Sequence, residues 1–201
     1  MLGLPHAIVH SAGDVGEQLA DPRIDAIAVG PGLGRGNGAT RLLDQARAAH
    51  RPLVLDADAL FVLAGTGVEK LRLAPHLPII TPHAGEFARM FGDLPGSKVD
   101  QARKAAEKAG AVTVYKGADT VVACPSGRAT IASSSSAWLA SAGAGDVLTG
   151  VIAAMRAGGM EAFEAACAGV WLHARAAEHA GPGLIADDLL DGLPKALAEC
   201  L

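Results

Sequence analysis

The chain has 201 residues, half of them apolar, which suffices for one buried core and is marginal for two. Its formal net charge of −4, the lack of a basic cluster and the scarcity of aromatic residues argue against a nucleic-acid partner. No apolar run reaches the ~18 residues of a membrane span, and the start, MLGLPHAIVH, is not typical of a secretory signal. The three widely spaced cysteines indicate neither disulfides nor zinc, so we expect a cytoplasmic protein.

Short apolar runs alternate with helical patterns along the chain. The first run, IDAIAVG, leads through the glycine-rich segment GPGLGRGNG into a stretch with apolar residues at helical spacing. The expected strands are 24–30, 52–56, 77–81, 111–116, 121–123 and 129–132, the last two joined by a turn at 125–127. The expected helices are 39–49, 97–109, 147–157, 161–180 and one that begins near 187.

This alternation predicts an α/β fold in which helices flank a mainly parallel sheet. Because no linker or repeat interrupts the pattern, we expect one domain over 1–201. Ligands of such sheets gather at the carboxyl ends of the strands. Glycine-rich or charged segments fall at those ends, after Gly30, at Asp56, at Thr81 and after Lys116, so the sequence predicts a small-molecule site there.

The segment SAGAGDVLTG, residues 141–150, places glycines and one carboxylate at the start of a helix. The first turn of a helix has unpaired N–H groups and a partial positive charge, so this backbone can hold a phosphoryl group. Asp146 could then take a proton from an attacking hydroxyl. A plain helix start is the simpler interpretation of an isolated G-x-G-D, but the longer arrangement GAGDVLTG favours the reaction site.

Two further segments allow both a structural and a functional interpretation. In VYKGADTVVA, Lys116 is either a solvated turn residue or a phosphate contact beside the helix start. In TPHAGE, His83 and Glu86 either form a turn with a capping glutamate or project into the cleft.

Two other segments are ambiguous. GPGLGRGNG is not a dinucleotide fingerprint, because the acidic residue which that motif requires is missing. Asp56 and Asp58 in LDADAL could bind a metal or cap the next helix, and the sequence favours neither.

Six segments in order, GPGLG, LDADAL, TPHAGE, KGADT, GAGDVLTG and GLIADDLLDGLP, resemble one family over residues 24–194. This family is the ADP-dependent NAD(P)H-hydrate dehydratases, which have a three-layer ribokinase-like fold. The combination of TPHAGE with KGADT and GAGD is specific for it, whereas GAGD alone indicates only the superfamily.

The resemblance implies a lyase that repairs hydrated nicotinamide nucleotides, NADHX and NADPHX. ADP, or ATP in some members, phosphorylates the C6 hydroxyl, phosphate leaves, and the ring double bond is restored. Mg²⁺ is expected with such a donor, without assigned ligands. The resemblance also implies a homo-oligomer, a tetramer in the family, and a functional pairing with an NAD(P)HX epimerase.

The resemblance assigns roles to individual residues. Asp146 matches the catalytic base of the family and also a substrate contact. Gly34 and His83 match two further substrate-binding residues. The nucleotide site corresponds to Lys116, Gly117, Ala118, Asp119, Thr120 and Gly145. The anion hole corresponds to Ala142, Gly143, Ala144 and Gly145.

Three departures from the family pattern stand out. Residues 136–139 read Ser-Ala-Trp-Leu where members usually have Asn-Pro-Gly-Met, and Phe61 replaces an asparagine after LDADAL. The resemblance implies a further glycine-rich strand and helix at the start of the domain, and we expect this segment to be missing here. We expect a sheet without that segment to expose an edge, with poor solubility or self-association.

Two alternatives to the dehydratase remain. A ribokinase-like kinase of a vitamin precursor, of the hydroxymethylpyrimidine or pyridoxal type, would use the same Asp146 and anion hole but release a stable phosphate ester. A non-catalytic nucleotide-binding remnant would bind ADP without turnover.

Overall fold

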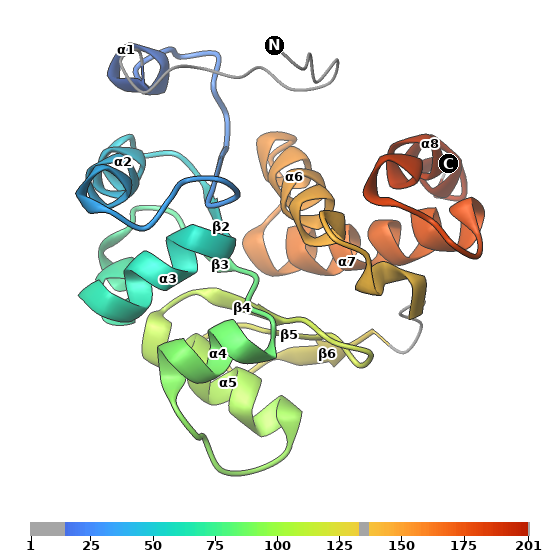
Figure 1. The fold of residues 1–201 in the computed structure, drawn as a ribbon. Coiled ribbons are helices and arrows are strands. Elements are labelled where there is room, and N and C mark those ends of the chain that lie inside the picture. The colour runs from blue at the N-terminus through green and yellow to red at the C-terminus, as the bar shows by residue number, and fades with distance from the viewer. Residues whose placement is uncertain (1–14, 133–136, 201) are drawn as a thin grey trace.

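The computed structural model describes residues 15–132 and 137–200, and a six-stranded sheet runs through its centre (Figure 1). The spatial order of the strands is their order in the chain, β1-β2-β3-β4-β5-β6. Strands β1 to β4 are parallel to one another, and β5 is antiparallel to both of its neighbours, β4 and β6. The strands are β1 Ile27–Val29, β2 Leu53–Leu55, β3 Ile79–Ile80, β4 Val112–Tyr115, β5 Val121–Ala123 and β6 Ala129–Ile131. β5 has the predicted bounds, and each of the other five strands is shorter than the predicted apolar run.

The predicted helices correspond to α2, α5, α6, α7 and α8, whereas α1, α3 and α4 were not among the predicted ranges. The α-helices are α1 Val15–Leu19, α2 Asn37–Ala48, α3 Ala57–Thr66, α4 Ala84–Phe91, α5 Lys98–Ala109, α6 Ala144–Ala157, α7 Ala162–Ala180 and α8 Ala186–Ala198. The 3₁₀ helices are η1 Val68–Leu73 and η2 Ala137–Ala140. Helix α6 begins at Ala144, earlier than predicted, so Asp146 lies inside its first turn. Among the described residues no helix is long and apolar enough to span a bilayer.

The two faces of the sheet pack against different helices. Leu53 and Leu55 of β2 lie in a core with residues of α2, α3, α4 and α5, whereas Val54 lies in a core with residues of α6 and α7. Figure 1 shows α6, α7 and α8 grouped together, apart from α3, α4 and α5. The predicted three-layer α/β architecture with a mainly parallel sheet is therefore confirmed.

Close backbone contacts bring the carboxyl ends of the parallel strands together. The N–H of Asp56 donates to Val29 O at 3.0 Å, and the N–H of Lys116 donates to Pro82 O at 2.9 Å. Gly30 has φ +142°, and a Cβ there would lie 1.7 Å from Asp56 O, so this contact requires glycine. These segments, which the sequence patterns singled out, thus meet at the carboxyl ends of the parallel strands.

Two sequence departures are only partly described. Trp138 and Leu139 lie in η2, while Ser136 is outside the described residues. β1 and β6 are the edge strands of the described sheet. Whether an open edge lowers solubility or drives self-association stays a prediction.

Candidate functional site

A buried carboxylate, Asp56, organises the edge of the sheet. Its side chain is 2% exposed and accepts from Lys116 Nζ at 2.8 Å through Oδ1 and from Thr149 Oγ1 at 2.8 Å through Oδ2. It makes no cap hydrogen bond to α3, so the capping interpretation of Asp56 is wrong. Both oxygens are instead used to join the end of β2 to the end of β4 and to α6.

The backbone between Asp56 and Asp58 is strained. Ala57 has φ +47°, in the left-handed region that costs a residue with a Cβ roughly 1–2 kcal/mol. Asp58 accepts from the N–H of Gly34 at 3.0 Å and from Arg35 Nε at 2.7 Å. These two bonds, that from Arg35 above all, lower the pKa of the Asp58 carboxyl. The two aspartates of LDADAL therefore have different partners. Asp56 binds groups beside the first turn of α6, here called the mouth of α6, and Asp58 binds the loop after β1.

The first turn of α6 offers donors to an anion. Gly143 caps the helix with φ +83°, and the N–H of Ala144 is taken by Ser141 O at 3.3 Å. Within the described part of the chain, the N–H groups of Gly143 and Gly145 have no acceptor. A Cβ on Gly145 would lie 3.3 Å from Lys116 Nζ, so glycine lets that ammonium approach the turn closely. Amide hydrogens and one cation converge there.

Asp146 stands in the same turn, exposed to solvent. Partial burial raises the pKa of its carboxyl, repulsion from Asp56 adds to the rise, and Lys116 opposes it. The three groups are therefore within electrostatic reach of one another. A carboxylate with a raised pKa is a stronger base, which suits proton removal from a hydroxyl.

His173 of α7, which the sequence did not indicate, contacts the first turn of α6. It is 6% exposed, and its Nε2 lies 2.8 Å from Ala144 O. A carbonyl only accepts, so Nε2 carries the hydrogen. Burial lowers the pKa of His173 to about 4, which keeps the ring neutral at pH 7. A lone histidine within an apolar helix gave no signal in the sequence.

The predicted nucleotide loop between β4 and β5 is closed by local contacts. Thr120 Oγ1 accepts from the N–H of Gly117 at 3.2 Å and donates to Gly117 O at 2.9 Å. Asp119 pairs with Lys98 Nζ of α5 at 2.5 Å, which lowers the pKa of its carboxyl. Lys116 thus points toward α6, whereas Asp119 points toward α5.

His83 is the N-cap of α4. Its Nδ1 accepts from the N–H groups of Gly85 at 3.0 Å and Glu86 at 3.3 Å, and Glu86 accepts from the N–H of His83 at 2.8 Å. The capping interpretation of TPHAGE is therefore confirmed. The His83 side chain is still 61% exposed, so its ring can also contact a ligand, and that role stays a prediction.

Two guanidinium groups contact the ring of Phe61. The guanidinium of Arg35 lies 4.6 Å from the ring centroid, and that of Arg89 lies 4.8 Å from it. Arg35 follows Gly34 in the first loop, and Arg89 lies on α4, the helix that His83 caps.

Metal ligands are sparse in the part of the chain that the structure describes. Residues 15–132 and 137–200 contain no group of three or more histidine, cysteine or acidic side chains placed to hold an ion. The site instead combines open amides, one ammonium and one carboxylate, which together can hold an anion and remove a proton beside it.

The chain has a ribokinase-like fold. The structure matches a ribokinase-like superfamily protein from Enterococcus faecalis V583 with a TM-score of 0.83 at 22% identity, over 97% of this chain and 70% of that one. It also matches the ADP/ATP-dependent NAD(P)H-hydrate dehydratase from Bacillus subtilis, co-crystallised with ATP/Mg²⁺, with a TM-score of 0.80 at 31% identity, over 98% of this chain and 74% of that one.

The sequence comparisons identify the family. A family model described as NAD(P)H-hydrate dehydratase matches residues 3–195, and the chain belongs to this family. The bifunctional NAD(P)H-hydrate repair enzyme Nnr of Salinibacter ruber is 42% identical over 185 residues, 87% of this chain. The chain spans 34% of the length of that relative.

Proposed function

We propose that the chain catalyses the ADP-dependent dehydration of NADHX and NADPHX to NADH and NADPH. The observation that carries the proposal is the first turn of α6. There Asp146 lies within electrostatic reach of Lys116, beside the open N–H of Gly145. Family membership and the ADP/ATP-dependent relative support the choice of substrate and donor.

The reaction uses these groups in a defined order. The C6 hydroxyl of the hydrated ring attacks the terminal phosphorus of ADP, and Asp146 takes its proton as the bond to AMP breaks. The amides of Gly143 and Gly145 and the ammonium of Lys116 stabilise the charge on the migrating group. The C6–O bond then breaks and inorganic phosphate leaves. Loss of a proton from the adjacent ring carbon restores the double bond.

The remaining site residues have supporting roles in this proposal. Asp56 and Thr149 fix Lys116, and His173 fixes the carbonyl of Ala144 at the helix start. Gly34 and His83 contact the substrate. The proposed nucleotide site is Lys116, Gly117, Ala118, Asp119, Thr120 and Gly145, and the proposed anion hole is Ala142, Gly143, Ala144 and Gly145.

Mg²⁺ fits this site only together with the nucleotide. Both oxygens of Asp56 are engaged, and Asp146 supplies one further carboxylate. Mg²⁺ commonly uses one or two carboxylates and takes its other ligands from substrate phosphates and water. When bound, it would neutralise charge on the donor phosphates.

The decisive test is incubation of the purified chain with hydrated NADH and ADP. We expect the absorbance of the reduced nicotinamide to return, and only with ADP present. A stable phosphoester with no gain in absorbance, using a hydroxymethylpyrimidine or pyridoxal substrate, would favour the vitamin-precursor kinase. ADP binding without any turnover would favour the nucleotide-binding remnant.

The cellular context of the chain is part of the same proposal. The Salinibacter relative is named bifunctional, which supports pairing of this domain with a second repair activity, an NAD(P)HX epimerase. Cys124, Cys167 and Cys200 are free thiols, in accord with a cytoplasmic location. A homo-oligomer, a tetramer by resemblance, is tested by light scattering of the purified chain.

A further inference from the structure

Two arginines from different elements share one aromatic ring beside the first loop. The guanidinium of Arg35 lies 4.6 Å from the centroid of Phe61, and that of Arg89 lies 4.8 Å from it. A cation over an aromatic face is attracted by the ring quadrupole, which holds the head group in place. The Arg35 side chain is 62% exposed and Arg89 is exposed as well, so solvent reaches both.

Most donors of these arginines are open. Arg35 gives its Nε to Asp58 at 2.7 Å, and Arg89 makes no hydrogen bond within the described residues. The carboxylate of Glu86, one turn before Arg89, accepts from the N–H of His83 instead. Within the described residues, Asp58 forms an ion pair with Arg35 and no carboxylate forms one with Arg89, so the two guanidiniums form an exposed cationic pair.

The cationic pair is connected to the α6 mouth but lies beyond it. Asp58, which holds Arg35, is two residues from Asp56, which holds Lys116. A helix rises about 1.5 Å per residue, so Phe61 lies about 6 Å along α3 from Ala57. Helices α3 and α4 pack against each other, which fixes Arg89 relative to Phe61.

We propose that Arg35 and Arg89 bind a phosphate of the substrate's dinucleotide, an inference that rests on the proposed function. A substrate whose nicotinamide ring reaches Asp146 must extend its remaining parts away from α6. Its only anions are the pyrophosphate and, in NADPHX, the 2′-phosphate. The planar guanidinium matches phosphate oxygens with two parallel donors. The aromatic ring of Phe61 positions the two guanidiniums, which an asparagine at this position could not do.

The test compares Arg89→Ala with the parent chain on three hydrated substrates. Hydrated NADPH carries both kinds of phosphate, hydrated NADH only the pyrophosphate, and hydrated dihydronicotinamide riboside none. We expect KM for hydrated NADPH to rise about tenfold or more, as for loss of a charged hydrogen bond, with kcat within about twofold. The riboside is expected to show no change in kcat/KM. Arg89→Lys keeps the charge and is expected to fall between.

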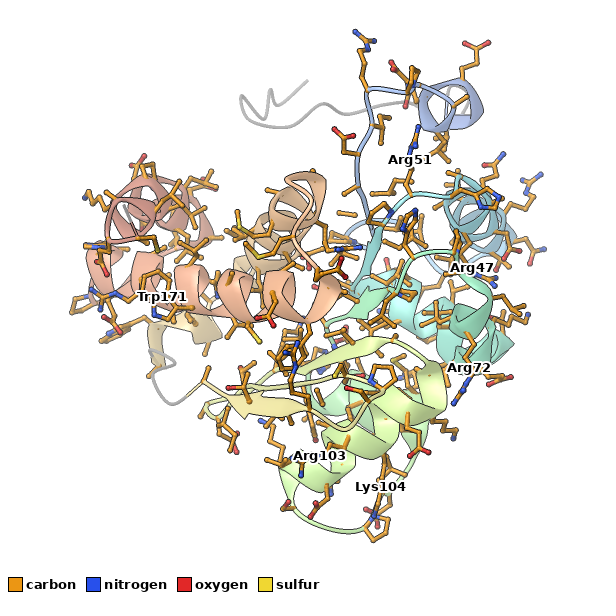
Figure 2. The ribbon with its side chains drawn as sticks, turned by 180° about the vertical axis from the view of Figure 1, so that it is seen from behind. Arg47, Arg51, Arg72, Arg103, Lys104 and Trp171 are labelled. Atoms are coloured by element: carbon orange, nitrogen blue, oxygen red, sulfur yellow. The ribbon has the colours of Figure 1, made fainter. Side chains whose placement is uncertain are left out.

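The matched control is Arg103→Ala. Arg103 is also an exposed arginine, but it lies on α5 and donates its Nε to Gly127 O at 2.8 Å (Figure 2). We expect this variant to leave KM for all three substrates unchanged, since it removes the same charge elsewhere on the molecule.

The outcomes separate the sources of the phosphate. A KM effect confined to hydrated NADPH assigns the contact to the 2′-phosphate, and equal effects on both dinucleotides assign it to the pyrophosphate. An equal effect on the riboside, or none on either dinucleotide, overturns the proposal. If the parent chain turns over none of the three, the proposed function fails. Calorimetry of Arg89→Ala in an Asp146→Asn background, with hydrated NADPH and the riboside, then decides the phosphate contact alone.

Discussion

The mouth of α6 and the cationic pair on Phe61 are built in opposite ways. At the mouth, Asp56 and His173 are almost fully buried, and both oxygens of Asp56 and Nε2 of His173 meet partners from other elements. The pair on Phe61 is exposed and depends on one ion pair and two ring contacts. Buried contacts fix groups within fractions of an ångström, as chemistry requires, while exposed charges tolerate a longer and more variable ligand. Substitutions at the mouth should therefore affect turnover or folding, and those in the outer region should affect only affinity.

The largest effect is expected for Asp146→Asn. This change removes the proposed base but keeps the amides of α6, so turnover should fall about a hundred to ten-thousandfold while ADP binding is kept. The raised pKa of Asp146 means that its ionised form destabilises the fold, so the variant should melt no lower than the parent. Steady-state kinetics, calorimetry with ADP and thermal melts measure the three quantities.

The control for this variant is Asp93→Asn, an exposed carboxylate after α4. It should leave turnover unchanged. Undiminished turnover in Asp146→Asn would remove this residue from the mechanism. For the parent, activity should fall with acidification at a higher pH than for an ordinary aspartate, because the base must be ionised.

Lys116→Met tests the buried ion pair. The substitution leaves the carboxylate of Asp56 without its cation in a buried site, so we expect a loss of about 3 kcal/mol in the free energy of unfolding. ADP affinity should also fall, with a shallower dependence on ionic strength. The measurements are urea unfolding and calorimetry at several salt concentrations.

The double variant Asp56→Asn/Lys116→Met separates these effects. It contains no unpaired buried charge, so most of the lost stability should return while the ADP affinity stays low. If Lys116→Met unfolds at the same urea concentration as the parent, the pair does not stabilise the fold.

Local sequence patterns predicted the outer frame of this site well. β2 and the start of α6 were found because apolar runs end at glycine or polar residues, and these signals lie within a few residues. The partnership of Asp56 with Lys116 spans 60 residues, and that of Asp56 with Thr149 spans 93. No local pattern encodes such tertiary contacts.

Two other features could not be predicted from the sequence, for different physical reasons. The left-handed backbone at Ala57 opposes the preference of alanine, so it exists only because surrounding packing imposes it. The role of Phe61 depends on Arg35 and Arg89 arriving from two other elements, so sequence showed only a missing asparagine.

His173 should make stability depend on pH. Its pKa is about 4 in the folded protein and near 6.5 when unfolded, so the unfolded chain binds a proton first. Stability is fully present above pH 6.5 and is lost as the pH falls toward 4, by about 3 kcal/mol in all. Urea unfolding at pH 7, 6 and 5 checks the slope.

The variant His173→Gln keeps a donor for Ala144 O without a titrating group. It should flatten this pH dependence, whereas His76→Gln, at an exposed position, should leave it intact. An unchanged slope in His173→Gln would assign the acid sensitivity to other groups.

The smallest effect is expected for Asp58→Asn, which contrasts with Asp56 two residues earlier. Its partners are the N–H of Gly34 and the exposed Arg35, and surface ion pairs are worth about 0–1 kcal/mol. Asparagine still accepts from Gly34, so the free energy of unfolding should change by less than about 1 kcal/mol. Arg35 loses its anchor, and KM for hydrated NADPH should rise only a few-fold with kcat unchanged. A loss of kcat as large as that of Asp146→Asn would show that the loop after β1 takes part in positioning the reacting hydroxyl, and the division between a rigid mouth and an adaptable outer region would then be wrong.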